Sequence, residues 1–588
     1  MIIITYSETS AETIEERLGK AEYSYYFIYK KYLPALEKLG ILIPVTTPQS
    51  EVDKIFLENP DEKCIFLSFS PPHKTLFNLR CPTVCIFAWE FTTIPQEYWH
   101  AQPEYNWAAS LETIGNAITI SQFAAGVVSK AIPHGLNLSV IPAAVDTVIP
   151  PLSPKTTDSK KLTVKATLHD SGAYNLEANM ADEKTQISPA LIQLKSWDGE
   201  DTYLTFTNGD SDSSELLVGF YDSEDWGTWS KAPVPWILVP YGVRGPVIIE
   251  IHLLAYGKNI GRDIQISLGQ ESTSLKLSAV PKIYPLQFNP KNDTRILKFS
   301  NLDLAHVAGF RDGRSLGIGI KSLKMKRPDT FSRKIRAKLL GGKKRSHHNL
   351  RPSISSVPDK AINLLELNGV VYTSILNPKD GRKNWEDLVT AFCWAFRNDE
   401  NATLVLKMTH HELGSFLGTL LLLYSQMSPF KCRVVAIHGF LSSEQYQQLI
   451  DRSHFVVNSS HCEGQCLPLM EFMGQGVPAV APDHTAMSDY VTKENAFIVK
   501  SSLYPTFWPF DERKAMRTLG YRIDWHSLME AFRASFQVAI NDEAAYQSMR
   551  VESIASVERV AGHEVVYNKM KNYFSHTAQK AAEQSSPS

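Results

Sequence analysis

The stretch that decides the fold is Ser-Ser-His-Cys-Glu-Gly-Gln-Cys-Leu-Pro-Leu-Met-Glu, residues 459–471. The apolar run 454–458 before it predicts a strand, and residues 467–473 predict a helix. Gly464 lets the backbone approach a ligand closely at this turn, where free N–H groups attract phosphate. Glu463 and Glu471 stand eight residues apart, so a loop glutamate and a helix glutamate can face one ligand. The stretch therefore predicts a ligand site at the end of a strand.

A second apolar segment, Gly-Val-Pro-Ala-Val-Ala-Pro at residues 476–482, follows and predicts a short buried strand. The whole run resembles the C-terminal signature of retaining glycosyltransferases of the GT-B fold, family 4 in particular. That signature is a glutamate, seven residues, a second glutamate and then a G-x-P-x-V strand, as at Glu463, Glu471 and Gly476. The resemblance implies an α/β protein with two Rossmann-like domains facing a cleft. The alternative is a pair of surface glutamates on a solvated helix.

The bulk composition sets broad limits on the class of protein. A chain of 588 residues is too long for one core and suggests about three domains. A net charge of −2 argues against a nucleic-acid-binding protein, because such proteins are usually basic. Seven cysteines, an odd and sparse set, favour reduced thiols in a cytosol, and they have no metal-site spacing. The N-terminus lacks a basic region and predicts a first strand instead of a signal peptide.

The order of predicted elements divides the chain into three folded parts. Residues 1–150 alternate short apolar strands with helices, which predicts a parallel sheet and an N-terminal Rossmann-like domain. Residues 363–540 are expected to form a C-terminal Rossmann-like, nucleotide-sugar-binding domain whose first strand is 370–374. Residues 541–576 are expected to be helices that pack back on the N-terminal domain, as the resemblance implies. Residues 577–588 are polar and predict a disordered tail.

Residues 158–322 have a different pattern of short alternating strands broken by Gly, Asn, Asp and Ser. This pattern predicts an inserted antiparallel β-sandwich, jelly-roll-like in type. Two strings, at 219–230 and 309–320, resemble an uncharacterised β-module that accompanies bacterial polysaccharide glycosyltransferases. Trp226, Trp229 and Trp236 either stack on a sugar or fill the sandwich core.

A basic linker is expected at residues 323–362, with ten lysines and arginines between Lys324 and Arg345 against one acid, Asp329. One interpretation is a solvated hinge. The other is attachment to an anionic membrane surface, where each basic residue contributes about 1 kcal/mol. We expect the protein in the cytoplasm or at the inner face of the cytoplasmic membrane, because no apolar run long enough to span a bilayer occurs.

A loop with basic residues follows the strand 370–374. Such a loop, opening a helix, suits a diphosphate. By resemblance Lys383 matches a lysine of the family. The family also has an arginine after this strand, and this chain departs from that pattern by having Asn377 at the position. Arg382, Lys379 or Lys407 is the candidate for the second positive charge. The alternative for Arg382 and Lys383 is a surface pair flanking a helix.

The remaining candidate site residues come mostly from the resemblance. It implies that Glu471 holds the ribose hydroxyls and that the backbone near Gly439 and Phe440 meets the base. It also implies that Glu463 lies by the donor sugar, together with the backbone of Gly464, Gln465 and Cys466. Many family members place a histidine in the N-terminal domain, whereas this chain offers Glu90 after a strand. Glu90 has either a polar role toward sugar or acceptor, or a buried ion pair. Gly19, in a glycine loop before the helix 26–39, either receives sugar or phosphate or forms a turn.

The resemblance implies an enzyme, a retaining glycosyltransferase that moves a sugar from a nucleotide-sugar donor to a growing glycan or lipid-linked acceptor of the bacterial polysaccharide or O-antigen type. No cofactor, metal or nucleic acid is expected. Two alternatives are a GT-B sugar-nucleotide epimerase, which needs further acid and base groups, and a non-catalytic carbohydrate-binding protein.

Overall fold

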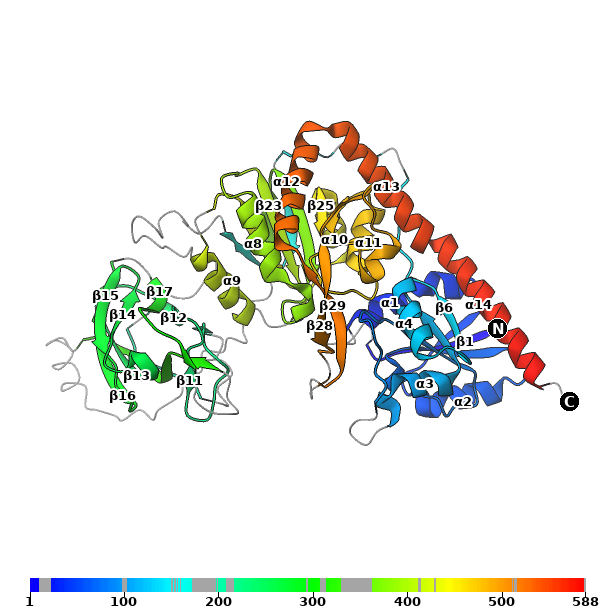
Figure 1. Cartoon of the computed structure of the whole chain (residues 1–588), viewed down its shortest axis with the longest axis horizontal. Helices are drawn as coiled ribbons and strands as arrows, with labels where there is room; N and C mark the ends of the chain where they lie inside the picture. The colour runs from blue at the N-terminus through cyan, green and yellow to red at the C-terminus, as the bar shows by residue number, and fades with distance from the viewer. Residues whose placement is uncertain are drawn as a thin grey trace. The chain divides into compact units, whose positions relative to one another are not determined.

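The computed structural model describes residues 1–9, 23–97, 103–149, 160–171, 199–207, 216–291, 294–306, 314–328, 362–410, 414–427, 430–509 and 515–585, with positions 152, 155, 157, 158, 197 and 511. The chain forms two compact units. The first, which we call the α/β unit, comprises residues 1–167, 362–411 and 431–588. The second, the β unit, comprises residues 168–361 and 412–430. Figure 1 shows the course of the chain.

The N-terminal part of the α/β unit is built on a six-stranded parallel sheet of order β2-β1-β3-β4-β5-β6. The order reverses between β1 and β3, and ligands of open α/β sheets bind beyond the strand ends at such a point. The elements are β1 (Ile2–Ser7), α1 (Tyr23–Glu37), β2 (Ile41–Pro44), α2 (Pro48–Glu58), β3 (Cys64–Phe69), η1 (Pro72–Lys74), β4 (Thr83–Phe87), η2 (Pro103–Tyr105), α3 (Trp107–Ile114), β5 (Asn116–Thr119), α4 (Gln122–Ala131) and β6 (Asn137–Val140).

The C-terminal part of the α/β unit has a second parallel sheet, of order β27-β26-β25-β22-β23-β24. This is the Rossmann order, and its reversal lies between β22 and β25. The elements are β22 (Val370–Leu376), η6 (Gly381–Lys383), α8 (Trp385–Ala395), β23 (Ala402–Met408), β24 (Arg433–His438), α10 (Ser443–Arg452), β25 (Phe455–Val457), α11 (Leu467–Gly474), β26 (Ala479–Ala481), η7 (Thr485–Asp489), β27 (Ala496–Ile498) and the hairpin of β28 (Ser501–Phe507) with β29 (Arg517–Ile523).

Three helices end the chain: α12 (Trp525–Asn541), α13 (Glu543–Ala561) and α14 (His563–Ser585). Helix α14 runs beside the N-terminal sheet in Figure 1, and its Val566, Met570 and Tyr573 are part of the hydrophobic core built around that sheet. The prediction of a disordered tail from residue 577 is wrong as far as Ser585, because α14 continues to that residue.

The two ends of the insertion meet in an antiparallel pair of strands. β7 (Lys160–Lys165) pairs with β21 (Ile362–Leu367), with Lys165 opposite Ile362. The sequence placed residue 158 onward in the inserted module, but β7 belongs to the α/β unit. The reason is geometric, because an insertion leaves and rejoins its host fold at neighbouring points.

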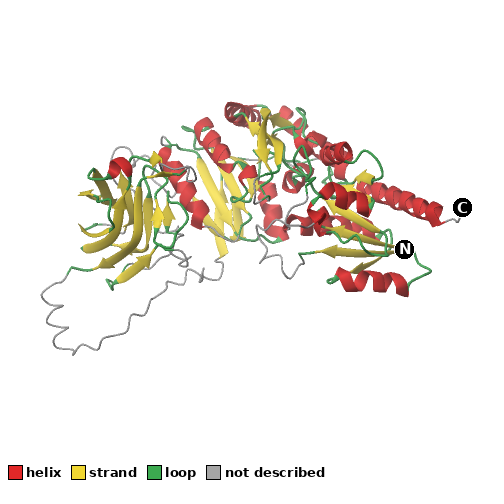
Figure 2. Ribbon diagram, turned by 60° about the horizontal axis from the view of Figure 1, so that its bottom comes forward, coloured by secondary structure: helices red, strands yellow, loops and turns green. Residues whose placement is uncertain are grey.

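The β unit consists mainly of antiparallel strands (Figure 2). One sheet has the order β10-β12-β17-β14-β15, and the other has the order β11-β20-β13-β16 with β9 on β20. Apolar side chains from both sheets form one core, because alternate residues of strands such as β13 are buried. The elements are β8 (Thr167–Asp170), which begins at the unit boundary, β9 (Thr202–Thr205), β10 (Leu217–Val218), β11 (Thr228–Trp229), β12 (Trp236–Val243), β13 (Val247–Ala255), η5 (Gly257–Asn259), β14 (Asp263–Leu268), β15 (Glu271–Lys276), β16 (Lys282–Phe288), β17 (Thr294–Ser300), β18 (Ala305–His306), β19 (Ser315–Leu316), β20 (Ile318–Lys326) and α9 (Gly414–Gln426).

The three tryptophans of the β unit have different environments. Trp236 is buried, whereas Trp226 and Trp229 are half-buried and pack edge to face with ring centroids 5.1 Å apart. The Trp226 indole N–H donates to Glu224 at 2.7 Å. Most of the predicted basic linker, residues 329–361, lies outside the described residues. No helix in the described ranges combines the length and apolar character that crossing a membrane requires.

Candidate functional site

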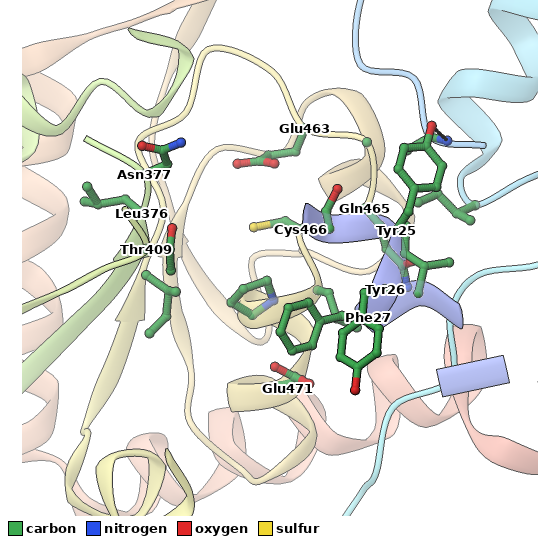
Figure 3. Close-up of a pocket in the computed structure, with 18 of the residues that line it drawn as sticks. Tyr25, Tyr26, Phe27, Leu376, Asn377, Thr409, Glu463, Gln465, Cys466 and Glu471 are labelled. Atoms are coloured by element: carbon green, nitrogen blue, oxygen red, sulfur yellow. Dashed lines mark hydrogen bonds between the residues drawn. The ribbon is translucent and has the colours of Figure 1, made fainter. Parts of the chain in front are cut away.

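The α/β unit contains a cavity of about 1610 Å³ that is lined from both of its parallel sheets. The C-terminal ends of β22 and β23 lie on one side, at Asn377 and Thr409, and the start of α1 lies on the other, at Tyr25–Phe27 (Figure 3). Glu463 and Glu471 lie at opposite ends of the cavity, with Cys466 between them (Figure 3). The cavity thus occupies the reversal point of the Rossmann sheet, where such sheets bind ligands.

Glu463 forms the centre of a network of charges at one end of the cavity. Its Oε1 accepts from Lys383 Nζ at 2.6 Å and from Asn458 Nδ2 at 3.2 Å, and its Oε2 lies 3.5 Å from Arg382 Nη1. The side chain is only 4 % exposed. Both cations lie in or beside the short turn η6, which Asp380 caps by accepting from the Arg382 backbone N–H. The local sequence therefore directs two cations at one carboxylate.

The charges of this network determine the ionisation of Glu463. Burial alone would raise its pKa, but Lys383 and Arg382 outweigh burial and lower the pKa of Glu463 to about 2. The pKa of Lys383 is raised, because Glu463 overcomes the effect of burial. Glu463 and Lys383 are therefore both charged at neutral pH.

Arg382 contacts three carboxylates. Besides Glu463, its Nη2 donates to Asp380 at 2.8 Å and its Nε lies 3.6 Å from Glu90 Oε1. Glu90 comes from the segment after β4, so this ion pair joins the two Rossmann-like parts of the unit. Burial raises the pKa of Glu90, and Arg382 offsets part of that rise. Glu90 is thus in the cavity wall and ion-paired at once.

Glu471, on α11, anchors the other end of the cavity. Its Oε2 accepts from the Tyr446 hydroxyl at 3.0 Å, and its Oε1 lies 3.4 Å from Lys31 Nζ. Burial raises the pKa of Glu471, and Lys31 and Tyr446 act against that rise. Lys31 was not identified from the sequence, and it lies one turn after Phe27 on α1, where both side chains line the cavity.

Residues 464–466 connect the two carboxylates. All three line the cavity at the start of α11, where the first backbone N–H groups have no partner within the helix and favour anions. A Cβ added at Gly464 would stand 3.1 Å from Ala88 Cβ, so glycine permits the close approach of the segment after β4. Cys466 has φ of 61°, and burial raises the pKa of its thiol to about 12.

The side chain of Gln465 has a role that the sequence did not indicate, since only its backbone was assigned to the site. Its Oε1 accepts from the Ala143 N–H at 3.1 Å, and its Nε2 donates to the Ala143 carbonyl at 3.0 Å. The amide of Gln465 therefore pairs with the backbone of the N-terminal domain like a neighbouring strand. Its side chain therefore joins the two domains.

The other predicted residues divide into those that line the cavity and those that do not. Asn377, Lys379, Lys407 and Phe440 line it, with Lys407 buried and donating to the Met408 carbonyl at 3.2 Å. Gly439 is not among the lining residues, whereas its neighbour Phe440 is. Gly19 lies outside the described residues.

Aromatic side chains line the N-terminal side of the cavity. The His73 ring is stacked against Tyr105 at 5.1 Å and Trp107 at 5.6 Å between centroids. The Trp107 indole donates to His73 Nδ1 at 3.0 Å, which leaves the Nε2 of a neutral His73 as the protonated nitrogen. No sequence motif indicated this group, since its members come from separate loops. Within the described ranges no cluster of three or more His, Cys, Asp or Glu residues is arranged to hold a metal ion.

Comparisons with known proteins give few firm likenesses. Residues 191–327 match a domain of unknown function, DUF7024, which lies within the β unit. No curated protein matches the chain.

Similar solved structures include three sugar-related proteins. TarM from S. aureus, solved with UDP, α-GlcNAc-glycerol and fondaparinux, is 12 % identical, with a TM-score of 0.27 over 35 % of each chain. The pneumococcal O-GlcNAc transferase GtfA, with UDP and GlcNAc, is 18 % identical, with a TM-score of 0.25 over 35 % of each chain. HepE from Anabaena, with UDP and glucose, is 9 % identical, with a TM-score of 0.40 over 98 % of this chain and 99 % of HepE. The matches to TarM and GtfA thus span about a third of those chains, and likenesses of this size carry no functional argument.

Proposed function

We propose that the chain is a GT-B glycosyltransferase that transfers a sugar from a nucleotide-sugar donor to a glycan or lipid-linked acceptor. The observation that carries the proposal is that Glu463 and Glu471, chosen from their spacing, line one cavity between two parallel sheets. Lys383 and Arg382 lie beside Glu463, and the N-terminal turn of α11 lies between the two glutamates. Such an arrangement offers separate places for a sugar, a diphosphate and a ribose.

The proposed reaction replaces one bond at the anomeric carbon by another. The bond between C1 of the sugar and the diphosphate oxygen breaks, and a bond between C1 and the acceptor oxygen forms. The acceptor's proton passes to the leaving diphosphate, so no external base is required. Lys383, and Lys407 or Lys379, stabilise the negative charge that develops on the leaving group, and the backbone at the start of α11 adds N–H donors. Retention of configuration follows from the resemblance.

The acceptor is proposed to bind on the aromatic side of the cavity. Pyranose rings have an apolar face that stacks on aromatic rings, and their hydroxyls need hydrogen-bond partners. Tyr105 and His73 offer rings for stacking, and Glu90 offers a hydrogen-bond acceptor for the hydroxyls. Attachment to the inner membrane face through the basic segment, and carbohydrate binding by a jelly-roll-like β unit, are further parts of the proposal that rest on the sequence alone.

Nucleotide binding is the first property to measure. Wild type and Glu471→Ala should be unfolded thermally with UDP, GDP, ADP and their sugar derivatives. A nucleotide at a hundred times its dissociation constant should stabilise wild type by about 2.7 kcal/mol. We expect one nucleotide family to do so, and Glu471→Ala to lose most of the effect because the ribose loses its acceptor.

The matched control is Glu444→Ala, which removes an exposed glutamate from α10 of the same domain. It should bind as wild type does. If no nucleotide stabilises wild type, the proposed function is wrong. A change in the bound nucleotide-sugar without any acceptor would instead favour an epimerase.

A further inference from the structure

Lys31 reaches from the N-terminal domain to the proposed ribose carboxylate of the C-terminal domain. Its Nζ lies 3.4 Å from Glu471 Oε1 and donates to Asp146 Oδ2 at 2.9 Å. Lys31 and Glu471 both line the cavity. Glu471 lies beside Tyr26 and Phe27 of α1, the helix that carries Lys31 (Figure 3). The ion pair therefore joins the two domains at the place where a ribose would bind.

The charged and titratable groups around Glu471 come from four segments. Lys31 belongs to α1, Tyr446 to α10 and Asp146 to the segment after β6, and His563 at the start of α14 bonds Asp146 at 2.8 Å. Lys31 is the cation that contacts Glu471 directly. Its own pKa is raised, because Glu471 and Asp146 together outweigh the effect of burial. Lys31 therefore remains protonated over the whole neutral range.

The carboxylate of Glu471 retains hydrogen-bonding capacity in this arrangement. An ionised carboxylate has about four acceptor sites on its two oxygens. Tyr446 uses one site on Oε2, and Lys31 occupies one on Oε1. One site on each oxygen remains, and two such sites suit the vicinal hydroxyls of a ribose. The two partners fix the plane of the carboxylate without using up its acceptors.

We propose that Lys31 is a positioning residue for the donor nucleotide, which orients Glu471 for the ribose 2′- and 3′-hydroxyls and couples domain contact to ribose binding. This inference rests on the proposed function. It adds Lys31, a residue of the N-terminal domain, to a proposed ribose site whose carboxylate, Glu471, belongs to the C-terminal domain.

The test compares Lys31→Met with Lys130→Met by isothermal titration. Lys130 is an exposed lysine on α4 of the same domain and is not among the residues that line the cavity, so it is a matched control. The probes are the nucleoside diphosphate that binds wild type best and its 2′,3′-dideoxy analogue. We expect Lys31→Met to weaken the ribonucleotide about tenfold, and the dideoxy analogue much less, because hydrogen bonds to a charged group carry that much affinity. Lys130→Met should change neither.

A second readout separates positioning from a merely structural role. Without Lys31, the pKa of Glu471 rises further, because the cation that opposes burial is gone. Ribonucleotide affinity of Lys31→Met should therefore fall at a higher pH on acidification than that of wild type, and Lys31→Arg should restore both affinity and pH dependence.

The outcomes distinguish this inference from the proposed function. If wild type binds no nucleotide, the proposed function fails and the inference fails with it. If wild type binds nucleotide but a folded Lys31→Met binds it equally well, or loses both probes equally, the inference alone is wrong. A variant that fails to fold would show the same loss for both probes, and Lys31→Arg would then decide the matter by restoring the preference for ribose or not.

Discussion

Individual side chains of the cavity differ in how their charge depends on their neighbours. Glu463, Glu90 and Glu471 are all carboxylates in a buried setting, yet burial wins only for Glu90 and Glu471, whose pKa values are raised. At Glu463 two adjacent cations, Lys383 and Arg382, outweigh burial, so the pKa is lowered instead. Proteins commonly separate the protonation of neighbouring acids in this way at sites where they bind or react.

The ionisation of Glu463 predicts a specific acid dependence of stability. Its pKa is lowered from an ordinary 4.5 to about 2, so its charge stabilises the fold above pH 4.5, and this contribution is lost as the pH falls toward 2. The shift corresponds to a contribution on the order of 3 kcal/mol. Glu463→Gln should therefore be less stable than wild type at pH 7, and the difference should shrink between about pH 4.5 and pH 3.

Urea unfolding midpoints of the two proteins between pH 7 and pH 3 measure this difference. Glu444→Gln, on the exposed face of α10, serves as the control and should stay close to wild type throughout. A constant difference between Glu463→Gln and wild type at every pH would show that the ion pair with Lys383 is not what stabilises this loop.

Sequence spacing found the residues of this site that lie close together in the chain, and missed those brought in by the fold. Glu463, Glu471, Lys383 and Arg382 follow strand ends in recognisable patterns, and all four line the cavity. Lys31 meets Glu471 only in the folded protein, where α1 of the N-terminal domain and α11 of the C-terminal domain line the same cavity. Pairing across so many residues leaves no local pattern, so no period or spacing could indicate it.

Elements with strong apolar periodicity were predicted closely, and the weaker ones were not. The strand predicted at 370–374 is β22, two residues longer than expected, and the helix predicted at 467–473 is α11, one residue longer than expected. β2, of sequence Ile-Leu-Ile-Pro, and the half-exposed hairpin of β28 and β29 were missed, because neither has a clear buried period.

The turn into α11 predicts that Gln465 joins the two domains. Gln465→Ala would leave both polar backbone groups of buried Ala143 without their partner, which should cost about 2 kcal/mol or more in unfolding free energy. The control is Gln475→Ala, at the other end of α11, where two exposed hydrogen bonds are lost, one to the Asp146 carbonyl and one from Gln447. Urea unfolding should show a clearly larger loss for Gln465→Ala. Equal losses would contradict the role of Gln465 in joining the domains.

For the molecule as a whole, the position of the insertion was predictable but its boundaries were not. A change from helix–strand alternation to short alternating strands indicated an inserted domain after residue 150. Its edges were misplaced because β7 has the same alternating composition as a sandwich strand. Only its pairing with β21, across the whole insertion, assigns it to the α/β unit.

This pairing predicts that the α/β unit folds without most of the insertion. Lys165 and Ile362 are register partners, so their Cα atoms should lie about 5 Å apart, a gap that a short Gly-Ser loop closes as a hairpin. A variant in which such a loop replaces residues 168–361 keeps strands β1–β6 and β22–β27 and every described residue of the cavity, and loses β8. It should bind the wild-type nucleotide with affinity within about threefold, which is less than 1 kcal/mol.

Helix α9 makes this experiment more demanding than the loop geometry alone suggests. The helix remains in the variant because it connects β23 and β24, yet it belongs to the β unit and contacts β10 there. Removing β10 exposes apolar surface on a helix rich in leucine, so the variant should be less soluble than wild type. Solubility and nucleotide affinity therefore need separate measurement, by sedimentation and by titration of the soluble fraction. A soluble, folded variant that no longer binds nucleotide would show that donor binding needs the β unit. Unchanged affinity would assign donor binding to the α/β unit alone.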